Sequence, residues 1–441
     1  MNASSSEVQS QPVLAPPPAD RYACRDCPAK CCRFPWRIDA TAEEVARYHA
    51  MPWLVERLKS AGVDFTPMEG AQTETGVSRY NMPRISDERG QTTCAFLDDD
   101  GLCAIQKAEG HAAIPKTCQQ YPFNFAKDAA SGEVYPMLSF FCPSVAANTG
   151  DPIAPQIAER YATQLAAGQV HALPEQLLLS DQPLPLSVAH ALCDQAVALL
   201  DNPSLTVDLA LLAVRQLTAA LQPLLLAGEP EVMMIEAIRQ FQPSQDAMAM
   251  TERRHFTGRM LTHLAVSRIL INGLVDDLRQ ETQPSRMVLV NLIVQLVGGR
   301  GSVRVWDFPA RVDLAAAGRV SLDWQLSDFQ ALLARYFRSQ FATRRILVVS
   351  SAGVRPDWQK RLFELAVRYA ATGRMARYRA AADGRDAVTL SDLQTAVGLL
   401  DTASLGFNPP KNNQLSSAME GVTAVLSGWE DSFCRALWAE A

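Results

Sequence analysis

Ten cysteines are the residues of this chain with the clearest chemical potential, and eight of them lie between positions 24 and 142. They form two groups: Cys24, Cys27, Cys31 and Cys32, then Cys94, Cys103, Cys118 and Cys142. Thiolate sulfur is a soft ligand that selects zinc or iron–sulfur clusters over magnesium, calcium or manganese. The two groups therefore predict a metal site, with an iron–sulfur cluster as the first interpretation and zinc as the alternative.

The first group reads Cys24-Arg-Asp-Cys27-Pro-Ala-Lys-Cys31-Cys32. Two cysteines separated by two residues can turn their sulfurs toward one ion, which is why this spacing recurs in zinc and iron–sulfur sites. Neighbouring side chains in extended backbone point to opposite sides. We therefore expect Cys31 and Cys32 not to share one ligand role.

The second group is spread along the chain, and a turn separates its first two members. Asp98-Asp99-Asp100-Gly101 is a turn signal between two short apolar runs. A hairpin at this point would bring Cys94 and Cys103 close together. The three aspartates lack the further spaced oxygen ligands and the closing Glu of a calcium loop, so a calcium site is not expected.

The remaining candidates fit structural roles better. Cys193 and Cys434 have apolar neighbours in helical sequence, where cysteine is a common small core residue. His49 and His111 are expected at the surface or in the core rather than as ligands. The radical S-adenosylmethionine signature C-x-x-x-C-x-x-C fails, because Cys27 and Cys31 are followed by a phenylalanine at position 34.

Charge and segment composition limit the class of protein. The formal net charge of -6 argues against a dedicated nucleic-acid binder, which needs a clustered basic surface. Apolar runs such as Met287 to Val297 are too short to cross a membrane. Residues 1–20 are rich in serine and proline and do not resemble a secretory signal. We expect a cytoplasmic protein with reduced thiols, no nucleic-acid partner and no membrane association.

The elements that must position the cysteines follow from local signals. Thr41-Ala-Glu-Glu44 has the form of a capping box and predicts a helix to about Lys59, bent at Pro52, which packs against the cysteine region. Glycine and proline at 149–152 mark a boundary. The predicted organisation is a disordered tail at 1–20, a cysteine-cluster metal-binding domain at 21–148 and a helical domain at 152–441.

Beyond the boundary the sequence predicts helix after helix. The expected helices cover 184–200, 205–226, 256–278, 326–343, 357–375, 389–401 and 415–438, with short strands at 303–306 and 346–350. Gly298-Gly299-Arg300-Gly301 is interpreted as a helix stop rather than a nucleotide-binding loop. Arginines between 335 and 379 favour a solvated basic helix face, with an acidic partner as the alternative. The fold class is mainly α, with a small irregular cysteine-rich N-terminal region followed by a larger helical domain.

Three motifs resemble the YkgJ-type cysteine-cluster family of bacteria, which is described as a zinc- or iron-chelating domain. They are the Cys24 to Cys32 group, Cys94-Ala-Phe-Leu with Leu-Cys103-Ala-Ile, and Pro115-x-x-Cys118-x-x-Tyr121-Pro122. The family's first motif is C-x-x-C-x-x-C-C, and this chain has one extra residue before Cys31. The segment from Leu102 to Cys118, together with Ser139-Phe-Phe-Cys142-Pro143, looks most like the FliB-type flagellin lysine-N-methylase branch.

This resemblance implies an iron–sulfur cluster, [4Fe–4S] in type, and S-adenosylmethionine used to methylate lysine side chains of flagellin. The sequence offers no catalytic base for that reaction. The alternative from the residues alone is a non-catalytic zinc-binding module whose helical domain binds a partner protein.

Overall fold

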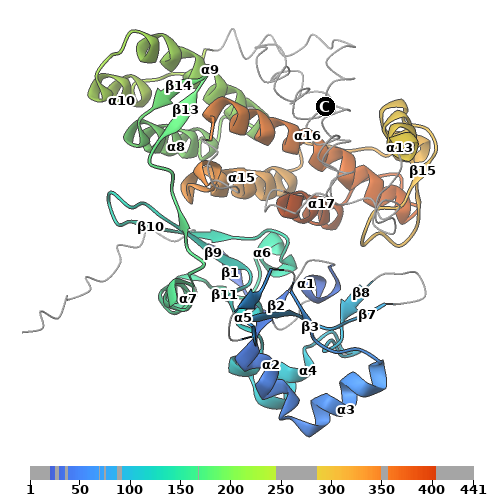
Figure 1. Ribbon diagram of the computed structural model, residues 1–441. Coiled ribbons are helices and arrows are strands. Elements are labelled where there is room, and N and C mark those ends of the chain that lie inside the picture. The colour runs from blue at the N-terminus through green and yellow to red at the C-terminus, as the bar shows by residue number, and fades with distance from the viewer. Residues whose placement is uncertain are drawn as a thin grey trace, which may run out of the picture.

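The computed structural model describes residues 20–24, 29–34, 38–68, 70–73, 76–86, 92–166, 168–244, 286–348 and 356–403. Several predictions lie outside these residues: the tail at 1–19, Cys27, Cys434, and the helices expected at 256–278 and 415–438. The described chain is mainly helical, as the sequence predicts. Figure 1 shows long helices in its upper half and short helices and strands in its lower half.

The lower part is a patchwork of short elements around a small core of its own, formed by side chains between Ile38 and Ile114. Its three small sheets are β2-β6-β3, β4-β5 and β7-β8, all antiparallel. Their strands are β2 (Asp39–Thr41), β3 (Thr66–Pro67), β4 (Gln72–Thr73), β5 (Gly76–Val77), β6 (Arg79–Asn81), β7 (Arg84–Ser86) and β8 (Thr92–Cys94). The helices are α1 (Lys30–Arg33), α2 (Ala42–His49), α3 (Pro52–Ala61), α4 (Ala104–Glu109), η1 (His111–Ala113) and α5 (Lys116–Gln120).

The predicted capping box is present, but the helix that it opens is shorter than expected. The Thr41 hydroxyl accepts from the Glu44 amide at 3.2 Å, and the Glu44 carboxylate accepts from the Thr41 amide at 2.8 Å. Helix α2 ends at His49, with Ala50 as its C-cap. A second helix, α3, then begins with Pro52 as its first residue. Proline has no amide proton to donate, so it fits the first turn of a new helix better than the middle of a bent one.

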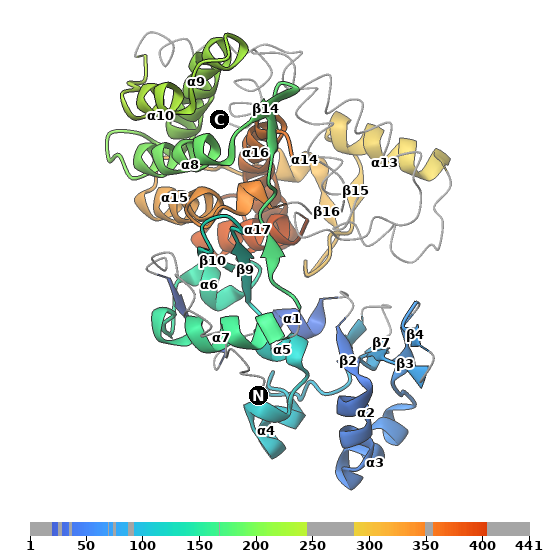
Figure 2. The same cartoon turned by 60° about the vertical axis from the view of Figure 1, so that its left-hand side comes forward.

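The upper part begins with β9 (Phe123–Lys127) and β10 (Val134–Leu138), an antiparallel hairpin to which β12 (His171–Ala172) adds in parallel. Helices then dominate, and Figure 2 shows α8, α9 and α10 stacked beside α15, α16 and α17. The helices are α6 (Pro143–Ala147), α7 (Ala154–Ala166), α8 (Leu186–Leu200), α9 (Val207–Leu226), α10 (Glu231–Arg239), α13 (Arg286–Gly298), α14 (Leu314–Ala317), α15 (Ser327–Ala342), η4 (Arg345–Leu347), α16 (Trp358–Ala382) and α17 (Leu390–Ala403). The remaining strands are β1 (Arg21–Tyr22), β11 (Asp151–Pro152), β13 (Leu177–Leu179), β14 (Gln182–Leu184), β15 (Ser302–Val303) and β16 (Val312–Asp313).

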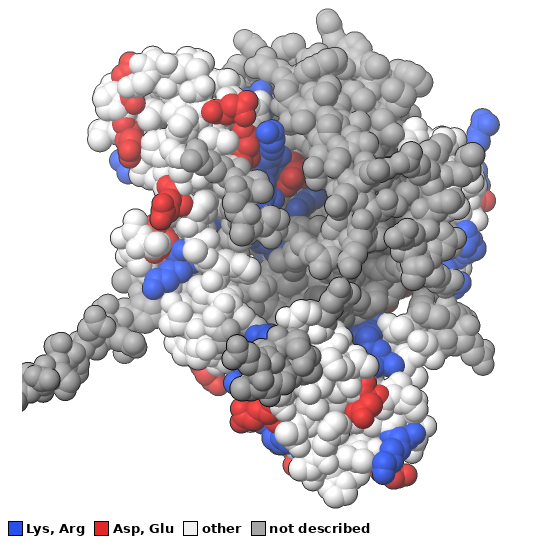
Figure 3. All heavy atoms as spheres, viewed as in Figure 1, with Lys and Arg blue, Asp and Glu red and all other residues white. Residues whose placement is uncertain are grey.

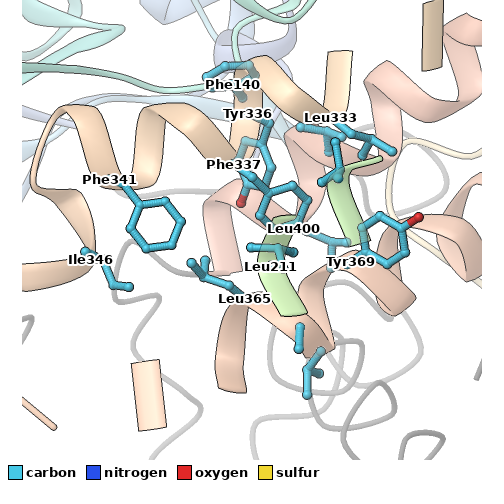
Figure 4. Close-up of a cluster of buried hydrophobic side chains, with 14 of the residues drawn as sticks. Phe140, Leu211, Leu333, Tyr336, Phe337, Phe341, Ile346, Leu365, Tyr369 and Leu400 are labelled. Atoms are coloured by element: carbon cyan, nitrogen blue, oxygen red, sulfur yellow. The ribbon is translucent and has the colours of Figure 1, made fainter. Parts of the chain in front are cut away.

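One large hydrophobic core joins these helices to the hairpin, with members from Tyr22 and Phe34 to Leu400. Figure 4 shows its centre, where aromatic side chains of α15 such as Tyr336 and Phe337 lie among leucines of α9, α16 and α17. The Trp324 and Tyr369 rings stack with centroids 4.8 Å apart. A Cβ at position 373 would lie 2.4 Å from the Trp324 ring, so only glycine lets α16 approach that ring.

Helix α9 is long and apolar enough to cross a membrane by length and composition, whereas the sequence was not expected to contain such a segment. Its buried side chains include Leu211, Val214, Leu217 and Leu221, which belong to the large core. A core helix and a membrane span share this composition because both must be apolar around most of their circumference.

Other expectations in the helical part are partly corrected. The strand expected at 346–350 is a 3-10 turn at Arg345–Leu347, and the strand expected at 303–306 is limited to Ser302–Val303. Helix α13 ends at Gly298, and Gly299 has a φ of 60°, so the glycine-rich segment is a helix stop as predicted. The boundary at 149–152 stays a prediction, although residues 123–146 share the core of the helices.

Arginines of the basic stretch from 335 to 379 form ion pairs with acidic residues of other segments of the chain. This differs from the solvated face that we expected. Its pairs include Arg335 with Asp20 at 3.1 Å, Arg338 with Asp201 at 2.8 Å and Arg345 with Asp401 at 2.8 Å. On the described surface visible in Figure 3, basic and acidic side chains are interspersed rather than separated.

Two connections tie the lower part to the upper part. Strand β1 pairs with β11, so residues 21 and 22 lie beside residues 152 and 151. Gly150 has a φ of 104°, and a Cβ there would lie 2.5 Å from the Ala23 amide nitrogen, so this close approach requires glycine. Phe34, at the end of α1, packs edge-on against Phe141 and Trp306 with centroids 4.8 and 4.4 Å away.

Asp401 provides a test of how α17 is anchored. This fully buried carboxylate accepts from the Ser139 hydroxyl at 3.1 Å and the Phe140 amide at 2.9 Å, and it pairs with Arg345. Asp401→Asn keeps the shape but removes the charge that compensates Arg345, so we expect a loss of about 3–5 kcal/mol in the free energy of unfolding. Chemical denaturation measures it. Asp201→Asn, which loses an exposed ion pair, is the control and should lower the free energy of unfolding by under about 1 kcal/mol. Equal losses in the two variants would contradict the proposal that Asp401 anchors α17.

Candidate metal and cofactor site

Six of the seven predicted cysteine ligands that the structure describes line a single cavity of about 220 Å³ in the lower part of the molecule. They are Cys24, Cys31, Cys32, Cys94, Cys103 and Cys118. Both sequence groups contribute, so side chains up to 94 residues apart meet at one place. Cys27 lies outside the described residues.

The adjacent pair does not have the conformation that we expected from extended backbone. Cys31 and Cys32 belong to the single turn of α1, where successive side chains are not directed to opposite sides. Their sulfurs stand 3.9 Å apart, and both line the cavity. The assumption of extended backbone, from which we expected separate roles for Cys31 and Cys32, was therefore wrong. Helix α1 turns both thiols toward the same cavity.

The predicted turn after Cys94 is present and has the predicted effect. The Asp98 amide donates to the Leu102 carbonyl at 2.9 Å, and Leu97 forms an isolated antiparallel bridge with Cys103. Cys94 at the end of β8 and Cys103 before α4 consequently both line the cavity. Asp98 and Asp100 form ion pairs with Lys107.

Cys118 reaches the cavity because the capping carboxylate of Glu44 also holds α5. That carboxylate accepts from the Lys116 amide at 2.8 Å, and the Thr117 hydroxyl donates to Asp39 at 2.8 Å. Helix α5 is therefore fixed by one hydrogen bond to the first turn of α2 and by another to the start of β2. The sequence predicted the cap, but not that its Glu44 would position a cysteine 74 residues further along the chain.

Arg84 joins the two cysteine groups. Its guanidinium donates to the carbonyls of Cys32 and Arg33, both at 3.3 Å, and to the Thr92 carbonyl at 2.6 Å. The end of α1 is thereby tied to β8, two residues before Cys94. Arg57 acts in the same way on the following turn, donating to the carbonyls of Ala95 and Leu97 at 2.7 and 2.9 Å. Neither arginine was singled out from the sequence, since nothing in the spacing marks them.

The rest of the lining is mainly apolar, and sequence reasoning did not identify it. Met82, Phe96, Ile105 and Ile114 face the cavity beside two tyrosines, Tyr22 and Tyr121. Burial raises the pKa of both phenols, so they are uncharged at neutral pH. The only advance signal was the position of Tyr121 inside the third motif.

Cys142 and Cys193 lie apart from the cavity lining. Cys142 precedes α6 and is buried in the large core, which also contains Tyr22 and packs against Tyr121. Cys193 is fully buried in α8, and burial raises its pKa to about 12. That position agrees with the structural role predicted for Cys193. Among the histidines weighed as ligands, His49 pairs with Asp64 at 3.0 Å and His111 lies in η1, neither on the cavity lining.

Most of the described thiols that line the cavity have raised pKa values, so they are protonated and uncharged at neutral pH unless a positive charge lies beside them. Burial raises the pKa of Cys94 to about 12 and raises that of Cys118 well above 9. Cys32 is the exception: a hydrogen bond with Cys31 lowers its pKa, with help from Arg84. Several thiolates in such an apolar space need a compensating positive charge, which a metal ion or cluster would supply.

The donor set fits a soft metal, but the sulfurs are not arranged around one point. Six thiols and no carboxylates are among the described lining residues, which is the chemistry of zinc or iron–sulfur sites. Within the described parts of the chain, no three Cys, His, Asp or Glu side chains are close enough to hold one metal ion. Four sulfurs around one zinc would stand roughly 3.8 Å apart. Only the Cys31 and Cys32 separation is known to match that value.

Comparison with known proteins points to one kind of protein over part of the chain. The chain is 28% identical over 158 residues to a lysine-N-methylase of Salmonella typhimurium, covering 35% of each protein. It is 37% identical over 68 residues to the flagellar biosynthetic protein FliU of Salmonella muenchen, covering 15% of this chain and 39% of FliU. The chain thus spans little more than a third of the length of either relative.

No family model and no solved structure matches the chain. The comparisons therefore support a distant relationship to FliB-like lysine-N-methylases, and the resemblance to the YkgJ-type cysteine-cluster family stays an expectation from the motifs.

A cysteine substitution tests whether the cavity holds the predicted metal. Cys118→Ser removes a half-buried sulfur from the lining and should lose most of the metal found in wild-type protein purified without oxygen. Cys193→Ala removes a fully buried sulfur elsewhere and should retain it. Elemental analysis for iron and zinc measures both. Full metal content in Cys118→Ser would exclude this cavity as the site.

A second substitution tests the positioning role of Arg84. Arg84→Gln loses the donors that join α1 to β8, so metal affinity should fall about 10–100-fold while the helical signal in circular dichroism is retained. Arg47→Gln, which loses one exposed hydrogen bond on α2, is the matched control. Competition with a chelator measures the affinity, and equal affinity in both variants would contradict the role of Arg84.

Proposed function

We propose that this chain is an S-adenosylmethionine-dependent protein-lysine N-methyltransferase that acts on flagellin and holds an iron–sulfur cluster in the thiol cavity. The observation that carries the metal part is the convergence of six cysteines from both motifs on one cavity. The printed names of the two relatives, a lysine-N-methylase and a flagellar biosynthetic protein, support the activity and the substrate. The proposal includes a cytoplasmic location, where thiols stay reduced.

The shape of the cavity favours a cluster over a single zinc ion. A cluster with several irons binds each cysteine through a different metal atom, so its sulfurs stand further apart than those around one zinc. A cavity of about 220 Å³ leaves room for such a body between the thiols. The residues proposed to hold it are among the six lining cysteines. Of the predicted set of eight, Cys142 lies apart from this lining and Cys27 lies outside the described residues.

The chain's own residues contribute position and exclusion of water. Arg84 and Arg57 fix the backbone on either side of Cys94, and Glu44 fixes α5. Phe96, Ile105 and Ile114 keep the lining apolar. An iron–sulfur cluster held by the lining cysteines would supply Lewis-acidic iron at this place. The acceptor lysine must lose its proton before methylation, and an apolar surface lowers the pKa of a lysine amine.

A second candidate function is a non-catalytic zinc-binding module whose helices bind a partner protein. The observation that favours it is the 3.9 Å separation of the Cys31 and Cys32 sulfurs, which suits two ligands of one zinc. Zinc would then contribute folding free energy of about 10 kcal/mol or more at neutral pH.

Two measurements separate these candidates. Protein purified without oxygen should be brown and contain iron if the cluster proposal holds, and colourless with stoichiometric zinc if the second candidate holds. Incubation of the iron-containing protein with S-adenosylmethionine and flagellin from the same organism should add 14 Da per methyl group to lysine residues, measured by mass spectrometry. A flagellin whose mass is unchanged under anaerobic conditions would refute the methylase.

A further inference from the structure

A second pocket lies behind α1, between the cysteine part and the large helical part. Its volume is about 300 Å³, at the lower end of small-molecule sites. Helix α1 contributes Lys30 and Arg33, α16 contributes Arg379, and α17 contributes Ser391 and Thr395. Figures 1 and 2 both show α1 next to α6 and below α17. Helices from opposite ends of the sequence therefore form this pocket.

The charged groups at this pocket leave an excess of positive charge. The cations of the lining are Lys30, Arg33 and Arg379, and its carboxylate is Asp307. Asp307 forms an ion pair with Lys30 at 3.2 Å, and Asp383, outside the lining, pairs with Arg379 at 3.4 Å. Three cations thus face two carboxylates, and Arg33 makes no ion pair with the residues that the structure describes. This balance disfavours a cationic ligand and favours an anion.

Arg379 adds a buried donor that has no acceptor. Its Nη1 atom is shielded from solvent and makes no hydrogen bond within the described residues, although it lies 3.4 Å from the Asp383 carboxylate. The guanidinium is held in place over the Phe308 ring, 5.6 Å from its centroid. A buried N–H group without an acceptor costs free energy, because it has lost its hydrogen bonds to water. An anion in the pocket would supply the missing acceptor.

The neutral part of the lining favours a phosphate group over a carboxylate. The hydroxyls of Ser391 and Thr395 add donors from α17, and Phe141 and Pro143 add an apolar wall. A phosphate group directs its oxygens to several sides and carries more than one negative charge at neutral pH, so it can accept hydrogen bonds from α1, α16 and α17 together. A carboxylate has only two oxygens, which lie in one plane. The volume exceeds that of one phosphate group and leaves space for a small organic part.

We propose that this pocket binds a phosphate group, either free phosphate or a small phosphate monoester, with Arg33 and Arg379 as its cationic donors. Lys30 keeps its ion pair with Asp307 and adds positive charge beside the ligand. The bound group bridges α1 to α16 and α17, and α1 also supplies Cys31 and Cys32 to the thiol cavity. The site goes beyond the proposed function, because it requires neither the cluster nor methyl transfer, and each can fail without the other.

Equilibrium dialysis of the full-length protein with labelled inorganic phosphate, at constant ionic strength, tests the site. Arg379→Gln should weaken binding about tenfold, because it removes the buried donor. Arg33→Gln should weaken binding about threefold, since solvent screens the charge of this exposed side chain. Its exposure also means that this variant does not threaten folding. Arg338→Gln removes one positive charge from α15, where the arginine pairs with Asp201, and as the matched control it should bind phosphate as wild type does. Circular dichroism should show the same helical signal in all four proteins.

Competition with unlabelled ligands identifies the class of anion and its source. Unlabelled phosphate should displace the label, and acetate at the same concentration should not. Adenosine monophosphate that displaces the label at lower concentrations than phosphate does would assign the site to a monoester, and equal or weaker displacement would assign it to free phosphate.

Three results would overturn the proposal. They are the absence of saturable phosphate binding to wild type, displacement by acetate as effective as that by phosphate, and equal binding in wild type, Arg33→Gln and Arg379→Gln. Equal weakening in Arg338→Gln and the two pocket variants would also overturn it, because binding would then follow the net charge of the protein rather than this pocket.

Discussion

One turn of helix is the constraint on which the cysteine part depends. Helix α1 is four residues long, too short to be stable alone, so contacts on its sides must hold it. On one side Phe34 is buried between Phe141 and Trp306 of the large core. On the other, Arg84 ties its last carbonyls to β8. The orientation of Cys31 and Cys32 is therefore set by packing and hydrogen bonding at a distance, rather than by their own local sequence.

The second constraint is the cost of placing ionisable groups in an apolar space. Burial raises the pKa of Cys94 to about 12 and that of Cys118 further, so these thiols stay protonated without a counter-charge. The same physics explains the pairing of Asp401 with Arg345, where a fully buried carboxylate is matched by a guanidinium and two hydrogen bonds. A pocket behind α1, lined by Lys30, Arg33, Asp307 and Arg379, differs in carrying more cationic than acidic side chains.

Sequence reasoning recovered what local signals encode. The capping box at Thr41, the turn at Asp98, the glycine stop after Gly298 and helices α8, α9, α15, α16 and α17 follow from short-range patterns. The short helices α10 and α14 were not predicted. Thiolate chemistry led us to expect that the two cysteine groups converge, and six of these cysteines do line one cavity. The conformation of Cys31 and Cys32 was missed because it depends on Phe34 and Arg84, whose partners lie 50 to 270 residues away. The same distance hid the pocket behind α1.

Strand β1 holds the beginning of the cysteine part beside its end, through only two residue pairs with β11. Joining positions about 130 residues apart costs a flexible chain roughly 4 kcal/mol of closure entropy. Once that junction has formed, the intervening residues behave as a closed ring whose entry and exit coincide. The junction therefore also sets the position of Cys24, which lies two residues beyond β1 at the start of the thiol lining.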